Sequence, residues 1–171
     1  MNLLRKNKTF ASLLSSSIFS MLGTSLFNIV FLIYASSMPH PKMMISLAEL
    51  CLLLPIIFAA YTGFLADRTK NKANFMIRAS WIQAVLFFLL IFLMMEKNWI
   101  SFWSIAGVKI LTDLITSYKS GLRAPILQNN LSAEEIQPAF GQIQGLSSII
   151  EIIGQPLGLS LIHISEPTRP R

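Results

Sequence analysis

Residues 75–95 read FMIRASWIQAVLFFLLIFLMM, and after Arg78 the only polar side chains in this stretch are Ser80 and Gln83. An α-helix rises 1.5 Å per residue, so about 20 residues cross the roughly 30 Å hydrocarbon core of a bilayer. Similar apolar stretches occupy residues 10–35, 44–65, 99–127 and 139–158. The sequence therefore predicts an all-α polytopic membrane protein with five transmembrane helices. Most of the circumference of the helix at residues 75–95 is expected to face lipid.

The composition agrees with a membrane protein. Of the 171 residues, 53% are hydrophobic and 13% are charged, and the mean hydropathy is +0.59. Soluble domains carry about 25% charged residues, so this composition argues against a water-soluble monomer. The net charge of +6 comes from cations in short clusters between apolar stretches, which argues against a nucleic-acid partner.

The residue types argue against metal and cofactor chemistry. The chain has a single cysteine, Cys51, and two widely separated histidines, His40 and His163. Neither a cysteine metal cluster nor the usual histidine spacings of metal hydrolases can be assembled from them. We therefore expect no metal site, no cofactor and no enzymatic activity.

The positive charges predict an orientation, because short cytoplasmic loops retain Lys and Arg. The first and third connections hold two basic residues, Lys42 and Lys97. The N-terminal segment with the second and fourth connections holds nine: Arg5, Lys6, Lys8, Arg68, Lys70, Lys72, Arg78, Lys119 and Arg123. We expect an integral protein of the cell membrane with a cytoplasmic N-terminus. Residues 10–35 are too long for the apolar part of a signal peptide, so an uncleaved first helix is the preferred interpretation.

Polar residues repeat every four positions along the first apolar stretch. They are Ser12, Ser16, Ser20, Thr24 and Asn28. This spacing places them on one face of a helix. Two interpretations remain open: close helix packing through small residues, or the wall of a hydrated cavity.

Ionisable residues inside the apolar stretches are a sharper signal, since a charge at the bilayer centre costs about 2.5 to 3.5 kcal/mol even on insertion scales. The sequence has Glu49, Lys109, Asp113 and Glu151 in such positions. Lys109 and Asp113 are four residues apart and can pair on one helix face. Asp113 and Glu151 lie at similar depths near the midplane, which favours a substrate or proton site over a purely structural pair. Glu49 lies nearer the outer end of its helix.

Local signals mark a turn and several helix breaks. Ser132 followed by Glu135 is typical of a capping box that opens the last helix. Pro55 and Pro125 lie inside predicted helices, where a proline removes a backbone hydrogen bond and commonly bends the helix.

One connection carries a specific motif. Residues 63–72 read GFLADRTKNK. This stretch resembles the signature loop between helices two and three of the major facilitator superfamily, with matches at Gly63, Leu65, Ala66, Asp67, Arg68 and Lys72. Lys70 and Asn71 depart from the pattern, and Asn71 weakens the charge relay that the family builds here. We expect Gly63 to allow close helix approach, and Asp67 to cap a helix or pair with a cation in the gate.

Two further stretches resemble the drug and siderophore exporter branch of this superfamily: residues 120–127, SGLRAPIL, and residues 154–158, GQPLG. The second is similar to the helix-five motif of antiporters, with Gly154, Pro156 and Gly158 as its members. The resemblance implies that residues 1–158 are the N-terminal transmembrane bundle of a twelve-helix transporter, five helices of a truncated six-helix half of a major facilitator fold. The C-terminal half of the same protein would be its missing partner.

The last residues differ in character. Residues 159–169, LSLIHISEPTR, resemble the translation of a transposase-end adapter used in sequencing libraries. They also interrupt the apolar run with His163, Glu166 and Pro167. We interpret residues 159–171 as a non-native tail, with a genuine polar tail on a five-helix protein as the alternative.

The function implied by the resemblance is proton-coupled efflux of hydrophobic or amphipathic small molecules. We expect this part of the chain alone to be inactive. The alternative is a non-transporting membrane subunit or scaffold, in which the charged residues and prolines serve packing only.

Overall fold

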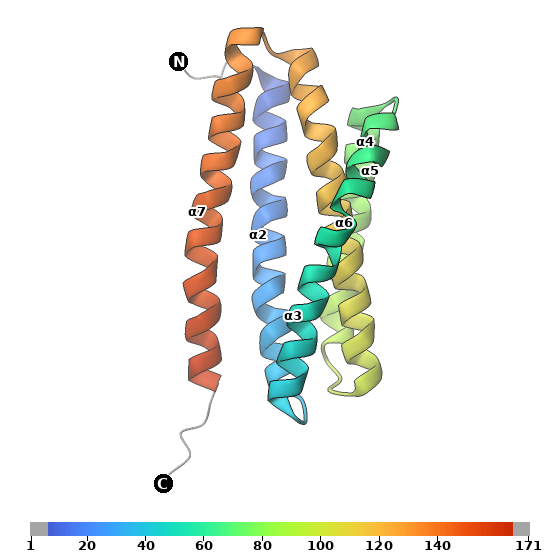
Figure 1. The fold of residues 1–171 in the computed structure, drawn as a ribbon, viewed down its shortest axis with the longest axis vertical. Helices are drawn as coiled ribbons and strands as arrows, with labels where there is room; N and C mark the ends of the chain where they lie inside the picture. The colour runs from blue at the N-terminus through green and yellow to red at the C-terminus, as the bar shows by residue number, and fades with distance from the viewer. Residues whose placement is uncertain (1–6, 166–171) are drawn as a thin grey trace.

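The structure, a computed structural model, describes the backbone of residues 7–165 and the side chains of residues 7–150, 152 and 153. All regular elements within this part are helices, which confirms the predicted all-α class (Figure 1). In chain order they are α2 (Lys8–Ser36), α3 (Pro41–Ile57), α4 (Ala59–Arg68), α5 (Lys72–Leu93), α6 (Trp99–Asn130) and α7 (Ala133–Ser165).

Four helical segments are long and apolar enough to cross a membrane. They are Lys8–Ser36, Pro41–Arg68, Lys72–Leu93 and Trp99–Asn130. The chain is therefore described as a membrane protein. Helix α7 spans 33 residues, but its C-terminal side chains lie outside the described residues, so its role as a fifth span stays a prediction.

The helix starts follow local capping chemistry. The side chain of Asn7 accepts a hydrogen bond of 3.1 Å from the backbone N–H of Phe10 at the start of α2. Asn98 does the same for Ser101 at the start of α6. Such caps satisfy N–H groups that have no partner within the helix.

The turn before α7 carries half of the predicted capping box. The carboxylate of Glu135 accepts a hydrogen bond of 3.3 Å from the backbone N–H of Ser132. This is the return bond from the third helical position to the cap residue. The capping motif thus starts α7 at Ala133, six residues before the predicted apolar stretch.

The second predicted span is not one continuous helix. The structure divides it into α3 and α4 at Phe58, whose backbone leaves the helical conformation at φ −90° and ψ 0°. Phe58 N–H bonds to the carbonyl of Pro55, three residues earlier, instead of continuing the four-residue pattern. Pro55 itself is buried. The prediction of a helix break near this proline is confirmed. Pro125, in contrast, lies inside an uninterrupted α6.

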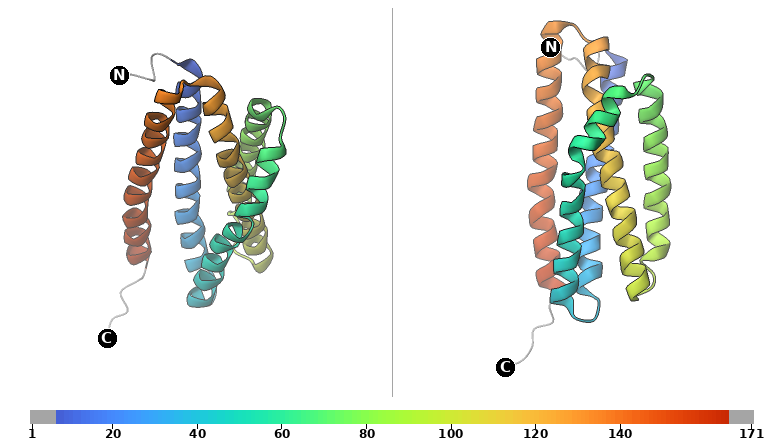
Figure 2. Two further views of the ribbon diagram at one scale, coloured as in Figure 1. Left: turned by 45° about the horizontal axis from the view of Figure 1, so that its top comes forward. Right: turned by 45° about the vertical axis from the view of Figure 1, so that its right-hand side comes forward.

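Helix α6 occupies the centre of the bundle. It packs against α2, α3, α4 and α5, whereas α7 packs mainly along α2 (Figure 1). Both views in Figure 2 place the turn between α6 and α7 at the end where the described chain begins. The side chain of Asn7 donates a hydrogen bond of 2.8 Å to the carbonyl of Asn130, which joins the start of α2 to the end of α6.

Two apolar clusters fill the bundle, one towards each end. We call the one near the start of α2 the proximal cluster; it contains Phe10, Leu13, Leu14, Ala66, Met76, Leu122, Ile126, Leu127, Leu131, Ala139 and Ile143. The distal cluster contains Phe27, Phe31, Tyr34, Ala35, Met38, Met44, Ala48, Cys51, Leu90, Phe102, Ile105 and Ala106. The middle of α2 and of α6 lies between the two clusters, and this region contains the polar residues described next.

Large apolar side chains cover the outside of α5. They include Trp81, Ile82, Val85, Phe88 and Ile91, each more than half exposed. Lipid is a solvent for such side chains, so this surface agrees with the expected lipid contact of the helix.

Candidate functional site: a polar layer inside the bundle

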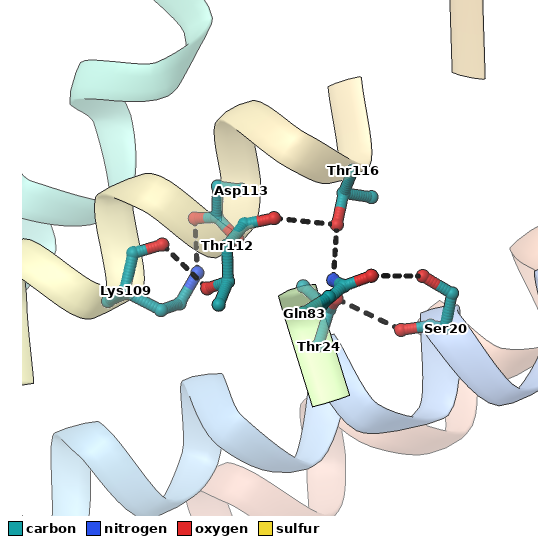
Figure 3. Close-up of polar contacts among 7 residues, drawn as sticks. All are labelled: Ser20, Thr24, Gln83, Lys109, Thr112, Asp113 and Thr116. Atoms are coloured by element: carbon teal, nitrogen blue, oxygen red, sulfur yellow. Dashed lines mark hydrogen bonds and ion pairs between the residues drawn. The ribbon is translucent and has the colours of Figure 1, made fainter. Parts of the chain in front are cut away.

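Eight polar residues from three helices form a layer between the apolar clusters, and Figure 3 shows all of them except Lys119. We call this set the polar layer. Its members are Ser20 and Thr24 on α2, Gln83 on α5, and Lys109, Thr112, Asp113, Thr116 and Lys119 on α6. On α6 the members recur every three or four residues, which places them on one face of the helix.

The layer begins with the predicted ion pair. The Lys109 ammonium donates a hydrogen bond to Asp113 Oδ2, and the side chains are 1% and 15% exposed, respectively. The ammonium also lies 5.6 Å from the centroid of the Phe27 ring, within cation–π distance. The sequence correctly predicted that these residues pair. The pair is buried against α2, where each charge compensates the other.

Gln83 connects the three helices. Its Nε2 donates a 2.9 Å hydrogen bond to Thr116 Oγ1, and its Oε1 accepts one of 3.0 Å from Lys119 Nζ and one of 3.4 Å from Ser20 Oγ. The residue is 3% exposed. From the sequence, Gln83 was expected only to be one of two polar residues in a helix that mostly faces lipid. Its contacts with α2 and α6 were not predicted. No local pattern on α5 marks it, because its partners come from other helices.

Threonine hydroxyls link the ion pair to Gln83 along α6. Thr112 Oγ1 donates to the carbonyl of Lys109, and Thr116 Oγ1 donates to the carbonyl of Thr112. Thr116 also accepts the hydrogen bond from Gln83. The hydrogen-bonding capacity of this face is therefore largely used within the protein, which stabilises a polar surface inside an apolar bundle.

The positions of Lys119 and Arg123 correct the sequence analysis. Both were assigned to the fourth connection, but they lie within α6, and the connection to α7 comprises only residues 131 and 132. Lys119 is 4% exposed, and Arg123 Nε is buried without a hydrogen-bond partner among the described residues. Their spacing continues the polar face of α6 through residues 109, 112, 116, 119 and 123, a signal that was present in the sequence.

The polar residues of α2 line two hollows. Ser16 and Ser20 border a cavity of about 70 Å³ together with Lys119 and Arg123. Ser12 and Ser16 border a larger groove of about 690 Å³ between α2 and α5. Thr24, in contrast, hydrogen-bonds to the backbone of its own helix. Three residues of this row therefore border hollows, and the choice between helix packing and a hydrated cavity wall stays a prediction.

The remaining ionisable candidates from the sequence are Glu49 and Glu151. Glu49 is exposed on α3. The side chain of Glu151 lies outside the described residues. For Gly154, Pro156 and Gly158 only the helical backbone is described. Their predicted roles stay predictions. Among the described residues, no group of three or more His, Cys, Asp and Glu side chains could hold a metal ion.

The signature-like loop between α4 and α5 shows a cation at a helix end. Lys72 Nζ donates hydrogen bonds of 2.8 Å to the carbonyl of Ala66 and 3.1 Å to that of Asp67. A cation at the C-terminus of a helix satisfies free carbonyls and opposes the negative end of the helix dipole. The Arg68 guanidinium lies 4.1 Å from the Phe64 ring centroid. Asp67 is exposed, and its pairing with a gate cation stays a prediction.

Close helix approach occurs where α4 crosses α6. A Cβ atom placed on Gly121 would lie 2.8 Å from the Cβ of Ala66 and 3.7 Å from the Cα of Gly63. A Cβ on Gly63 would meet nothing within 4 Å. The contact therefore depends primarily on Gly121, and Gly63 borders it from the opposite helix.

Comparison with known proteins identifies no family and no function for the chain. No protein family, no curated protein and no solved structure matches the chain.

Proposed function

We propose that the chain is the N-terminal transmembrane bundle of a secondary active transporter of the major facilitator type, located in the cell membrane with its N-terminus in the cytoplasm. The proposed activity is proton-coupled efflux of hydrophobic or amphipathic small molecules. In this proposal the C-terminal half of the same protein supplies the rest of the pathway, and the chain by itself transports nothing. The sequence resemblance at residues 63–72, 120–127 and 154–158 motivates the proposal.

The single observation that carries the proposal is the ion pair of Lys109 and Asp113 inside a membrane helix bundle. A carboxylate in this setting is stabilised by the adjacent ammonium. Adding a proton to Asp113 removes that attraction and leaves the charge of Lys109 without compensation, so protonation changes the relative energies of alternative conformations. A ligand shifts such an equilibrium only by its different affinity for the two conformations. Asp113 is thus the preferred proton-coupling residue, with Lys109 as its partner.

The test measures transport by the proposed full-length transporter, including its C-terminal half, in inverted membrane vesicles energised by a proton gradient. Asp113→Asn and Glu151→Gln are expected to abolish uptake of an amphipathic dye driven by the gradient. Glu134→Gln, at an exposed carboxylate in the first turn of α7, is the control and should retain uptake. Unchanged gradient-driven uptake in both test variants would refute the coupling assignment.

The ion pair of Lys109 and Asp113 also supports a second function, that of a non-transporting membrane subunit. Because Asp113 is already neutralised by Lys109 on the same helix, the pair also suits a non-transporting membrane subunit, in which it orders the bundle. Reconstituted protein that moves no substrate under a proton gradient, yet loses stability when the pair is broken, would favour this alternative.

A further inference from the structure

The 70 Å³ cavity contains an excess of positive charge. Lys119 and Arg123 both border it, and neither forms an ion pair with a carboxylate of the described residues. Lys119 is 4% exposed, and within the described part of the chain its ammonium has two neutral partners, Gln83 Oε1 at 3.0 Å and Ser20 Oγ at 3.4 Å. Burying a charge is costly unless an opposite charge compensates it. The described residues around the cavity therefore supply no counter-charge.

Hydrogen-bond donors in the cavity are also available. Arg123 Nε is buried and has no partner among the described residues. Ser16 and Ser120 place hydroxyl-bearing side chains on the cavity wall. Hydroxyl, ammonium and guanidinium groups all donate hydrogen bonds, and charge-assisted bonds to an anion are the stronger ones. The cavity therefore presents donors on several sides.

Size restricts the ligand. Sites for drug-sized molecules occupy about 300 to 1,000 Å³, well above the 70 Å³ found here. The cavity accommodates one small ion and excludes an organic substrate. The cavity is also separate from the ion pair of Lys109 and Asp113. Thr116 lies on the polar face of α6 between that pair and Lys119, and it donates a hydrogen bond to the carbonyl of Thr112.

We propose that Lys119 and Arg123, with the hydroxyls of Ser16 and Ser120, form a binding site for one small inorganic anion of about the size of chloride. The bound anion compensates one of the two positive charges and links α2 to α6. A resident ion held between α2 and α6 needs no transport step, so this site is independent of the proposed transport activity.

The test uses the purified chain in detergent micelles and radioactive chloride in equilibrium dialysis, with gluconate as the balancing anion. We expect saturable binding of one chloride per chain. Lys119→Gln and Arg123→Gln should each weaken binding about tenfold or more, as expected for loss of one charge-assisted hydrogen bond. Lys119→Arg, which keeps the positive charge, should bind more tightly than Lys119→Gln.

Arg78→Gln is the matched control, since Arg78 is an exposed cation on α5, and it should leave binding unchanged. Circular dichroism establishes that each variant is helical before dialysis. Absence of saturable chloride binding to the parent chain would overturn the proposal, whatever the variants do. Parent-like binding by the combined Lys119→Gln and Arg123→Gln variant, or a loss in Arg78→Gln equal to theirs, would also overturn it.

Discussion

At the scale of single residues, the molecule concentrates its polar chemistry on one face of α6. Lys109, Thr112, Thr116 and Lys119 follow one another at helical spacing, and all have hydrogen-bond partners inside the protein. Removing the hydrogen-bond partner of a buried polar group lowers the stability of the fold, because lipid offers no replacement partner. The stability of the bundle should therefore respond strongly to single changes in this layer.

Removing one member of the ion pair should be more damaging than removing both. Asp113→Leu leaves the Lys109 ammonium buried without its counter-charge, and we expect a loss of roughly 3 to 5 kcal/mol in the free energy of unfolding. The combined change Lys109→Met with Asp113→Leu removes both charges and should recover most of that loss. Unfolding in mixed micelles with increasing SDS measures the difference. A double variant as unstable as Asp113→Leu would contradict the compensation described here.

Gln83 should behave as a second sensitive position. Gln83→Leu removes one hydrogen-bond partner from Thr116 and one from Lys119, and we expect a cost of about 1 to 3 kcal/mol in the same unfolding assay. Ser80→Ala is the control on the same helix, since the bond that the Ser80 hydroxyl makes to the described residues is to the carbonyl of Met76, one turn earlier on α5. If both changes cost the same, Gln83 does not connect the helices energetically.

At the scale of helices, α6 organises the bundle because α4 and α5 both pack against it. The polar face described above is one of its contacts, and the close crossing with α4 is another. At this crossing the helices meet through Gly121, Ala66 and Gly63. Small residues allow two helix backbones to approach in a membrane, where close packing supplies much of the association energy.

The crossing predicts unequal effects of two glycine substitutions. Gly121→Ala places a methyl group 2.8 Å from the Cβ of Ala66, so we expect a loss of about 1 to 3 kcal/mol from overpacking. Gly63→Ala meets open space and should be tolerated. Combining Gly121→Ala with Ala66→Gly removes the collision and should restore part of the stability. A more severe effect at Gly63 than at Gly121 in SDS titration would show that the crossing is not arranged in this way.

At the scale of the whole molecule, basic connections lie at one end of the bundle. The loop between α4 and α5 lies at the same end as the turn between α6 and α7 (Figure 1). Lys42 and Lys97 lie near the connections at the other end. Lys119 and Arg123 lie in the interior of α6 and no longer count as loop residues. The N-terminal segment and the connection between α4 and α5, with its flanks, then hold seven basic residues, against two in the other connections. This smaller excess still predicts a cytoplasmic N-terminus.

Cysteine labelling in intact cells tests this orientation. In a chain carrying Cys51→Ala, we expect Lys42→Cys and Lys97→Cys to react with a membrane-impermeant maleimide added outside. Lys70→Cys should react only after the membrane is permeabilised, because positive loops stay on the cytoplasmic side. The reverse labelling pattern would place the N-terminus outside.

The sequence by itself determined the helical class, most helix positions, the capping of α7, the break near Pro55 and the pairing of Lys109 with Asp113. Each of these depends on residues close together in the chain or on hydrophobic periodicity, which local chemistry sets. Only the tertiary structure decided that Gln83 joins α2, α5 and α6, and that a buried Lys119 and a half-buried Arg123 lie beside a cavity. The physical reason is that a cation near a helix end has the same local sequence signature whether it faces water or a neighbouring helix, and only the packing of distant helices distinguishes the two.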